Sequence, residues 1–502
     1  MSMPQTQNVS ETSADGDPRL AKEKKLQALR DAGIDPYPHV FPRDSRAGDL
    51  QQKYEGLETG AETGDVVHVA GRIMAMRNSG MFIDLHDPSG KIQVFSHKDS
   101  MSEDNMKMLD YLDLGDIIGV VGTVRRTPRG ELSVRAQKIV MLSKSLAVLP
   151  EKHHGLSDVE MRYRQRYVDL IVNDDSRHVL RTRSMIMSKI REYLTNIGGV
   201  EVETPILHPI LGGASAKPFS THYNALDHDF YLRIAPELFL KRLMVGGFAD
   251  HVFEINRNFR NEGVSVRHNP EFTMLESYHA YFDYHQVMNL VEDLVRYVVL
   301  AVHGSLQITF GDKVIDFSGP WKRASMCDLV REATGIDFMS IDNDEAARAA
   351  CKTAGVHVEN TASWGQCVEA VFGEKVEHTL IQPTHVTDFP FEISPLAKNH
   401  RDHPRLVERF ETYCCTWEII NAFTELNDPK VQYERFMDQV RQREAGDDEA
   451  QMLDQDYVNA LEYGLPPCGG WGMGVDRLIM ILTNSHNIRD VICFPTLRPM
   501  KD

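Results

Sequence analysis

Hydrophobic and polar residues alternate in two different ways along the chain. Between residues 66 and 142, short runs rich in β-branched and aromatic residues predict five strands, over 66–75, 81–86, 91–96, 117–125 and 131–142. Turn sequences separate these runs, and the spacing within 101–114, between the third and fourth strands, indicates a helix. Upstream, a helix over 18–32 that ends at Gly33 is predicted by the helical spacing of Leu20, Leu26 and Leu29.

Five strands with a helix between the third and fourth is the order of an OB-fold β-barrel, which commonly binds single-stranded nucleic acid. A generic small β-barrel without a ligand would give the same pattern. We therefore expect an OB-fold domain over 66–145, preceded by a disordered tail over 1–17 and by a helix and connection over 18–65. A linker over 146–165 follows, because Leu149-Pro150 and a charged stretch interrupt the pattern.

The second half of the chain mixes helices and strands, which predicts an α+β domain over 166–502. A helix over 181–196 ends at Gly198-Gly199. A strand over 251–260 places polar side chains on one face, at Glu254, Asn256, Asn258 and Arg260. A second strand over 271–281 places Phe272, Met274, Glu276, Tyr278 and Ala280 on one face. An exposed hairpin would fit this pattern too. A stretch near 323–375, rich in Ala, Asp and Glu, indicates a helical insertion.

Composition narrows the class of protein but does not settle it. No apolar run is long enough to span a membrane, and the first 18 residues have no apolar core of a secretory signal. Seven cysteines without CxxC spacing argue against a zinc site or a disulfide framework and fit a reducing cytoplasm. Cys414 and Cys415 are expected to be strand thiols on opposite faces. The net charge of −18 argues against nucleic acid, but residues 66–144 carry 11 Lys and Arg against 9 Asp and Glu, so charge decides nothing.

Three short motifs occur in one order. Phe259-Arg260-Asn261-Glu262 closes the first strand of the polar hairpin and resembles motif 2 of class II aminoacyl-tRNA synthetases. Glu201-Val202-Glu203-Thr204-Pro205 resembles motif 1, and Gly472 to Arg477, GMGVDR, resembles motif 3. The flanks LRIAPELFLKRL and FRNEGVSVRHNPEFTMLE are similar to those of the lysine-specific family, and the similarity covers roughly residues 60 to 500. A dinucleotide fingerprint is not favoured for the glycines, since their spacing is GxGxG and no strand precedes them.

The resemblance implies an OB-fold anticodon-binding domain and a catalytic domain built on an antiparallel sheet flanked by helices. The implied reaction activates L-lysine with ATP to lysyl-adenylate and transfers the lysyl group to the 3′ end of tRNA(Lys). Pro205 would lie at the interface of a homodimer. Such chemistry needs alignment and charge neutralisation more than covalent help, and guanidinium groups grip phosphate and carboxylate bidentately.

By the same resemblance, the catalytic residues are Arg260, Glu262 and Arg477. ATP would contact Arg260, Glu262, His268, Asn269, Phe272, Glu411 and Arg477. Mg²⁺, which takes oxygen ligands, would be held by Glu411 and Glu418. Lysine would be bound by Gly213, Glu237, Glu276, Tyr278, Asn421, Phe423 and Glu425. We expect Glu276 and Glu425 at the ε-ammonium. On the barrel, the anticodon would be read by Phe82, Gln93 and Glu131, although Phe82 could instead be a core residue.

One departure from the family pattern stands out. The turn between the proposed metal ligands is Cys414-Cys415-Thr416-Trp417, where the family usually has glycine. Such a turn must avoid positive φ or accept strain. Glu418 also has the wrong parity to share a face with Asn421, so a bulge or twist is expected. Two alternatives stay open: an aspartyl- or asparaginyl-type synthetase, and a non-catalytic regulatory paralogue. The acidic Glu276 and Glu425 oppose the first, and the intact Arg260 and Arg477 oppose the second.

Overall fold

The computed structural model describes residues 17–150, 156–446 and 449–500, and the chain divides into two compact units, 1–157 and 158–502. The predicted tail lies outside the described residues except for Asp17, whose side chain accepts a hydrogen bond from the Arg19 N–H at 2.9 Å and caps α1 (Pro18–Asp31). Among the described residues, no helix is long and apolar enough to cross a membrane.

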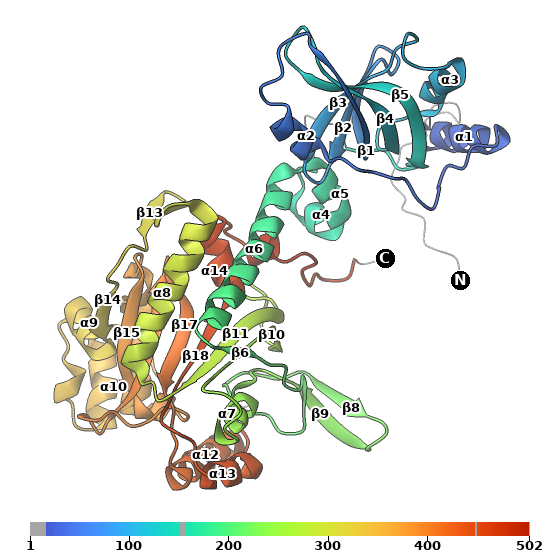
Figure 1. Ribbon diagram of the computed structural model, residues 1–502. Helices are drawn as coiled ribbons and strands as arrows, with labels where there is room; N and C mark the ends of the chain where they lie inside the picture. Colours follow the sequence, from blue (N-terminus) through green and yellow to red (C-terminus); the bar gives the residue numbers. More distant parts are fainter. Residues whose placement is uncertain (1–16, 151–155, 447–448, 501–502) are drawn as a thin grey trace. The chain divides into compact units, whose positions relative to one another are not determined.

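The first unit is a closed five-stranded barrel, seen at the top of Figure 1. Its strands are β1 (Glu62–Arg77), β2 (Phe82–Asp87), β3 (Gly90–Phe95), β4 (Ile117–Arg126) and β5 (Leu132–Ser143), in the order β1-β2-β3-β5-β4. Helix α3 (Glu103–Tyr111) connects β3 to β4, and α2 (Ala47–Lys53) packs beside β3. This is the strand and helix order that the sequence predicted for an OB fold.

Alternation along the barrel strands separates a core face from an outer face. Ile83, Leu85, Ile92 and Val94 are almost fully buried, whereas the residues between them are only half-buried. Phe82 is among these half-buried residues and is not part of the core, so the alternative that it is a plain core residue is wrong.

The second unit begins earlier than expected. Residues 151–155 of the predicted linker lie outside the described part of the chain. The remainder of that stretch already contains α4 (Val159–Arg164), because the Asp158 side chain accepts hydrogen bonds from the Glu160 and Met161 N–H groups. Helices α5 (Arg166–Val172) and α6 (Asp174–Asn196) follow; α6 starts well before the predicted 181, with acidic residues in its first turn.

An eight-stranded sheet forms the body of the second unit, in the order β14-β15-β16-β17-β18-β11-β10-β6. Its strands are β6 (Val200–Glu201), β10 (His251–Phe259), β11 (Glu271–Ala280), β14 (Lys322–Ser325), β15 (Thr384–Pro390), β16 (Leu406–Cys414), β17 (Trp417–Thr424) and β18 (Cys468–Gly474). All neighbouring pairs are antiparallel except β14–β15 and β10–β6. Strand β18, which carries the glycine run, lies in the middle of this antiparallel sheet, which excludes the dinucleotide-binding reading.

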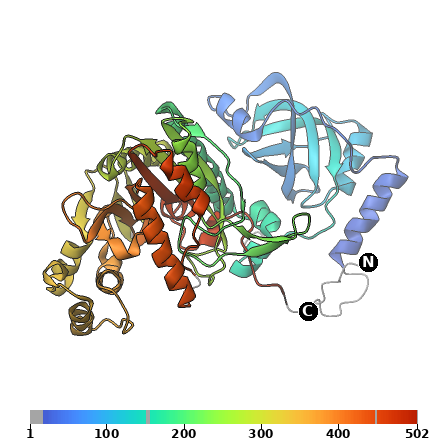
Figure 2. The same ribbon diagram turned by 90° about the horizontal axis from the view of Figure 1, so that it is seen from below.

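Helices cover one face of the sheet (Figures 1 and 2). The main hydrophobic core joins α6, α8 (Tyr284–His303) and α14 (Val475–Leu482) to strand residues such as Phe253, Leu275, Ile420 and Met473. The predicted insertion is helical and contains α9 (Met326–Thr334), α10 (Asp344–Thr353) and α11 (Trp364–Lys375). The other helices of this unit are α7 (Glu237–Val245), α12 (Pro429–Glu444), α13 (Gln455–Glu462) and α15 (Ile488–Val491), with the short 3₁₀ helices η1 (Phe338–Ser340), η2 (Glu377–Thr379) and η3 (Phe391–Ile393). Strands β12 (Gln307–Phe310) and β13 (Lys313–Asp316) form a hairpin. A small sheet contains β7 (Leu207–His208), β9 (His228–Leu232) and β8 (Ser220–Tyr223), in that order.

Candidate active site

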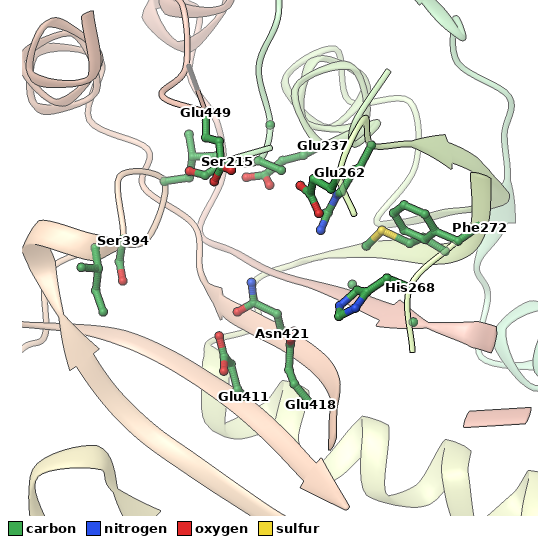
Figure 3. A pocket seen from close by; sticks show the side chains of 18 of the residues that line it. Ser215, Glu237, Glu262, His268, Phe272, Ser394, Glu411, Glu418, Asn421 and Glu449 are labelled. Carbon is green, nitrogen blue, oxygen red and sulfur yellow. The ribbon is translucent and has the colours of Figure 1, made fainter. Parts of the chain in front are cut away.

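The face of the sheet opposite the helices carries the polar side chains. Strands β10 and β11 pair Glu254 with Glu276 and Asn258 with Phe272, so the predicted polar faces of the two strands coincide. Strand β17 adds Asn421 opposite both Glu411 of β16 and Gly472 of β18. Of these residues, Phe272, Glu411, Asn421 and Gly472 line a cavity of about 620 Å³ (Figure 3).

The nucleotide residues predicted from motif 2 gather at one end of this cavity. Arg260, Glu262, His268, Asn269 and Phe272 all line it, and the Arg260 guanidinium lies 5.2 Å from the centroid of the Phe272 ring. Burial lowers the pKa of Arg260, and among the described residues its Nε has no hydrogen-bond partner. A buried Nε–H without an acceptor is costly unless an anion binds the guanidinium, so this end of the cavity is suited to phosphate or carboxylate.

Arg477 of motif 3 enters the same end from the start of α14. It donates to the backbone carbonyl of Glu418 at 2.6 Å, lies 3.3 Å from a carboxylate oxygen of Glu418, and approaches Nε2 of His268 at 3.2 Å. Burial and the positive charge of Arg477 lower the pKa of His268. The two arginines of motifs 2 and 3 are therefore brought to one wall of the cavity, as the motifs predicted.

Glu411 and Glu418 point into the cavity from the neighbouring strands β16 and β17 (Figure 3). Strand register shifts between Thr412 and Tyr413, which pair with Ile420 and Glu418, so Ile419 is an extra residue on β17. This is the expected bulge, and it corrects the parity of Glu418.

Two carboxylates that share a water-poor site repel each other. Burial and the charge of Glu418 raise the pKa of Glu411 to about 7. Arg409 donates to Glu411 at 2.5 Å, and Tyr413 donates to its other oxygen at 2.7 Å. A pair of hard oxygen ligands that destabilise each other fits a divalent cation that brings its remaining ligands with it.

The turn between these strands accepts strain, the second of the two outcomes foreseen for a turn without glycine. Cys415 has φ 54° and Thr416 has φ 65°, as both central residues of a tight hairpin turn require. Their N–H groups donate to the carbonyls of Ile381 and Leu380, which holds the turn in place. The expectation for the two thiols was wrong: Cys415 lies in the turn, and its Sγ is 3.8 Å from that of Cys414.

The predicted lysine-binding residues divide into two groups. Gly213, Glu237, Asn421 and Phe423 line the cavity. Glu276, Tyr278 and Glu425 do not line it, but lie buried beside Glu237 in a polar chamber, which we define as Glu237, Lys241, Glu276, Tyr278, Phe423, Glu425 and Tyr457. The Tyr278 hydroxyl donates to Glu276 at 3.0 Å.

The buried carboxyl groups of the polar chamber interact strongly with one another. Burial and the neighbouring Glu237 raise the pKa of Glu276 to about 8. Burial also raises the pKa of Glu425, although Lys241 opposes that rise. Among the described residues, the Glu425 carboxylate has one charged partner, the Lys241 ammonium, which contacts Oε2, and its Oε1 accepts no hydrogen bond. Such a chamber favours a ligand that brings positive charge.

The glycine run makes room for this chamber. A Cβ at Gly470 would lie 1.8 Å from a carboxylate oxygen of Glu425 and 2.6 Å from Cε1 of Tyr278. Gly472 is less restricted, with its nearest neighbour, Met274 Cε, at 3.2 Å. The glycine run therefore leaves the space that the side chains of the polar chamber occupy.

Sequence reasoning missed two basic residues at the site. Arg409 lines the cavity and donates to Asn421 at 3.0 Å as well as to Glu411. Its spacing of two from Glu411 was the available signal, because alternate strand residues share a face. Lys241 of α7 forms ion pairs with Glu237 and Glu425, and its spacing of four from Glu237 was a similar signal.

The predicted anticodon residues lie on the barrel unit. Phe82 packs against Phe95 with ring centroids 5.3 Å apart, and Arg125 lies 5.1 Å from the Phe95 centroid. Gln93 accepts a hydrogen bond from Ser133 at 3.0 Å, and Glu131 lies 3.9 Å from the Lys91 ammonium. The two aromatic rings, an amide and a guanidinium offer the groups that unstacked bases bind.

Pro205 follows β6 and is exposed. Its carbonyl lies 2.9 Å from Nε2 of His208. Apolar side chains around it are exposed as well, with Ile197, Val200, Ile206 and Leu207 between 37% and 45% accessible. Contiguous exposed apolar residues mark interaction surfaces.

Two family models match the chain. Residues 158–498 match the tRNA synthetases class II (D, K and N), and residues 67–142 match the OB-fold nucleic acid binding domain. The first match covers the whole sheet, the cavity and motifs 1, 2 and 3. The chain therefore belongs to the class II tRNA synthetases of this group.

Full-length relatives narrow the group further. The chain is 56% identical to a lysine–tRNA ligase of Rhizobium etli (strain CIAT 652), covering 99% of both chains. It is 54% identical to the ligase of that name from Rhizobium meliloti (strain 1021), covering 99% of this chain and 100% of the relative. It is 52% identical to the lysine–tRNA ligase of Syntrophomonas wolfei subsp. wolfei (strain DSM 2245B / Goettingen), covering 95% of this chain and 96% of the relative. Within its class, the chain is a member of the lysine–tRNA ligase family.

Proposed function

We propose that the chain activates L-lysine with ATP and transfers the lysyl group to tRNA(Lys), and that the cavity on the open face of the sheet is where it does so. Full-length identity of 52–56% to lysine–tRNA ligases supports the reaction. The same identity argues against an aspartyl- or asparaginyl-type enzyme, which the class model alone would allow. The observation that carries the site is Arg260, whose buried Nε has no partner among the described residues and which lines the same cavity as Glu237 and Phe272.

In this proposal the lysine ammonium groups enter the polar chamber and the lysine carboxylate meets Arg260. Glu276 and Glu425 serve the ε-ammonium, and Glu237 with Gly213 serves the α-amino end. Phe272 stacks on adenine while Arg477 takes the far end of the triphosphate. The carboxylate oxygen is then held next to the α-phosphate, and Arg260 stabilises the charge that develops as pyrophosphate leaves.

Magnesium belongs to this proposal through Glu411 and Glu418. The ion would neutralise charge on the phosphate oxygens. Arg409 holds Glu411 through a hydrogen bond of 2.5 Å, which fixes the carboxylate before the nucleotide arrives. The pairing of Arg477 with Glu418 similarly holds Arg477 near the position where a phosphate would bind.

The proposal has three further parts. The barrel reads the anticodon through Phe82, Gln93 and Glu131, and the OB-fold family match over 67–142 favours this role. Two copies associate around Pro205, since its exposed apolar neighbours need cover. The protein works in the cytoplasm, which suits its seven free cysteines.

Amino-acid-dependent pyrophosphate exchange with all twenty amino acids tests the reaction. We expect exchange with lysine and none above background with aspartate or asparagine. A signal with aspartate or asparagine in place of lysine would assign the chain to another branch of its class, and no signal with any amino acid would favour a non-catalytic paralogue.

A further inference from the structure

The polar chamber contains a built-in ammonium group. Lys241 lies on α7, one turn after Glu237, and its side chain is fully buried. Its Nζ lies 2.6 Å from Oε1 of Glu237 and contacts Oε2 of Glu425, so one cation bridges two carboxylates from different elements. The same Nζ is 5.3 Å from the centroid of the Phe423 ring.

Lys241 does not occupy the cavity itself. Glu237 and Phe423 line the cavity, whereas Lys241 contacts both of them from within the protein. A lysine substrate entering from the cavity would therefore meet carboxylates already held by Lys241. The two ammonium groups, of substrate and protein, would share these carboxylates without needing the same position.

Charge in the chamber matches lysine only when Lys241 is counted. Glu237, Glu276 and Glu425 are all buried, and when all three carboxyl groups are ionised the one built-in cation leaves two negative charges unbalanced. Lysine brings two ammonium groups, and its carboxylate has Arg260. Buried charges are tolerated when they are paired, so the filled chamber would be neutral.

We propose that Lys241 is a positioning residue for lysine recognition, which opposes the protonation of Glu237 and Glu425 and holds them in place so that the two ammonium groups of the substrate complete the charge balance. This inference rests on the proposed lysine site and deepens it. Without Lys241 the chamber would hold three buried carboxyl groups and no cation of its own. Some of them would take up protons instead, and lysine would have to displace those protons in order to bind.

The titratable groups that face Lys241 come from every element around it. Lys241 interacts electrostatically with Glu237 on α7, Glu425 after β17, Tyr457 on α13 and Cys468 on β18. Glu276 and Tyr278 on β11 interact with Glu425, and Arg409 on β16 interacts with Glu237. Burial lowers the pKa of Lys241, but the charges of Glu237 and Glu425 outweigh this effect and raise the pKa well above its usual value. Lys241 therefore stays charged wherever the enzyme is assayed, and any pH dependence in its absence belongs to the carboxyl groups.

Lys241→Met tests the inference, because methionine has similar length and no charge. In pyrophosphate exchange from about pH 6.5 to about pH 8.5, we expect the lysine KM to rise roughly tenfold at the acidic end. The excess over wild type should shrink as pH rises, since Glu237 and Glu425 regain their charge. The ATP KM should stay within about twofold. Lys189→Met on α6, a partly exposed lysine paired with Glu192, is the matched control.

Several outcomes would overturn the inference. A lysine KM ratio that does not change with pH, or an ATP KM that rises in parallel, would mean that Lys241 only supports the fold. If circular dichroism shows that the methionine variant is unfolded, Lys241→Gln keeps a hydrogen-bond donor without the charge and is held to the same criteria. Glu425→Gln in the same assay separates the two proposals. An unchanged lysine KM in Glu425→Gln would contradict the proposed lysine site itself. A raised lysine KM in Glu425→Gln, together with an unchanged KM in Lys241→Met, would contradict only the proposed role of Lys241.

Discussion

The barrel and the catalytic sheet present functional side chains in opposite ways. On the barrel, Phe82, Gln93 and Glu131 are half-exposed on the outside of a closed sheet. On the catalytic sheet, Glu276 and Glu425 are at most 5% exposed and lie among other charges. Stacking of a base needs an accessible ring, whereas selection of a small ligand with two ammonium groups needs charges that water does not screen. We therefore expect substitutions on the sheet to act through charge and pH, and substitutions on the barrel to act through contact area.

Arg260→Lys should have the largest effect. A lysine cannot reproduce the planar two-pronged grip of a guanidinium, so we expect kcat/KM in pyrophosphate exchange to fall roughly 10²- to 10³-fold. Arg257→Lys, on the same strand but with the opposite parity, should leave exchange near wild type. Equal losses of kcat/KM in the two variants would mean that β10 tolerates no substitution, and would contradict a specific role of Arg260.

Glu425→Gln should weaken lysine binding roughly 10- to 100-fold as measured by KM, because a charge-assisted contact is lost in a buried chamber. The ATP KM should be largely unchanged, since the nucleotide residues line the cavity and Glu425 does not. Glu434→Gln, an exposed position on α12, controls for loss of a carboxylate in general. An unchanged lysine KM would remove Glu425 from the pocket.

Phe82→Ala should impair only the tRNA step. Loss of one base–aromatic stack predicts a fall of roughly 5- to 100-fold in kcat/KM for tRNA. Pyrophosphate exchange without tRNA should be unaffected, and the size of the loss should not depend on pH. Tyr37→Ala, an exposed aromatic of the same unit, is the control. Equal loss of pyrophosphate exchange and tRNA charging would contradict the proposed anticodon role of Phe82. It would also contradict the expected difference between substitutions on the barrel and on the sheet.

Lysine binding should release a proton. Glu276 holds its proton up to a pKa of about 8, far above its ordinary 4.5, because burial and Glu237 disfavour the charged form. A raised acid pKa means that stability falls as pH rises from about 4.5 towards about 8, and that a bound ammonium drives the proton off. Calorimetry near pH 7 in buffers of different ionisation enthalpy should detect this release. Its persistence in Glu276→Gln would assign it to another group.

Thr416→Gly should have the smallest effect and the opposite sign. A β-branched residue at φ 65° is strained, so glycine should raise the free energy of unfolding by roughly 1 kcal/mol despite its greater backbone entropy. Thr195→Gly, at an exposed position near the end of α6, should instead lower it. Urea denaturation measures both. A loss of stability in Thr416→Gly would show that the hydrogen bonds to residues 380 and 381 leave no strain to relieve.

Much of the fold could be predicted because its signals are local. Alternation placed Glu254 to Arg260 and Phe272 to Tyr278 on matching faces, and the register of β10 with β11 confirms it. The strand and helix order of the barrel was also readable, since turns and β-branched residues mark its boundaries. The start of α6 was missed because residues 174–178 are polar and give no apolar period to detect.

What only the tertiary structure decided is which charges meet. The sequence by itself determined the class, through three ordered motifs, and named the glutamates of the lysine pocket by resemblance. It did not reveal that Lys241 bridges Glu237 and Glu425, or that Gly470 must lack a side chain to leave room for Glu425. Nor did it tell which proposed lysine ligands line the cavity and which lie buried beside it. Residues from α7, β11, β17 and β18 meet there, and the energy of a buried charge depends on its neighbours in space, which sequence spacing does not record.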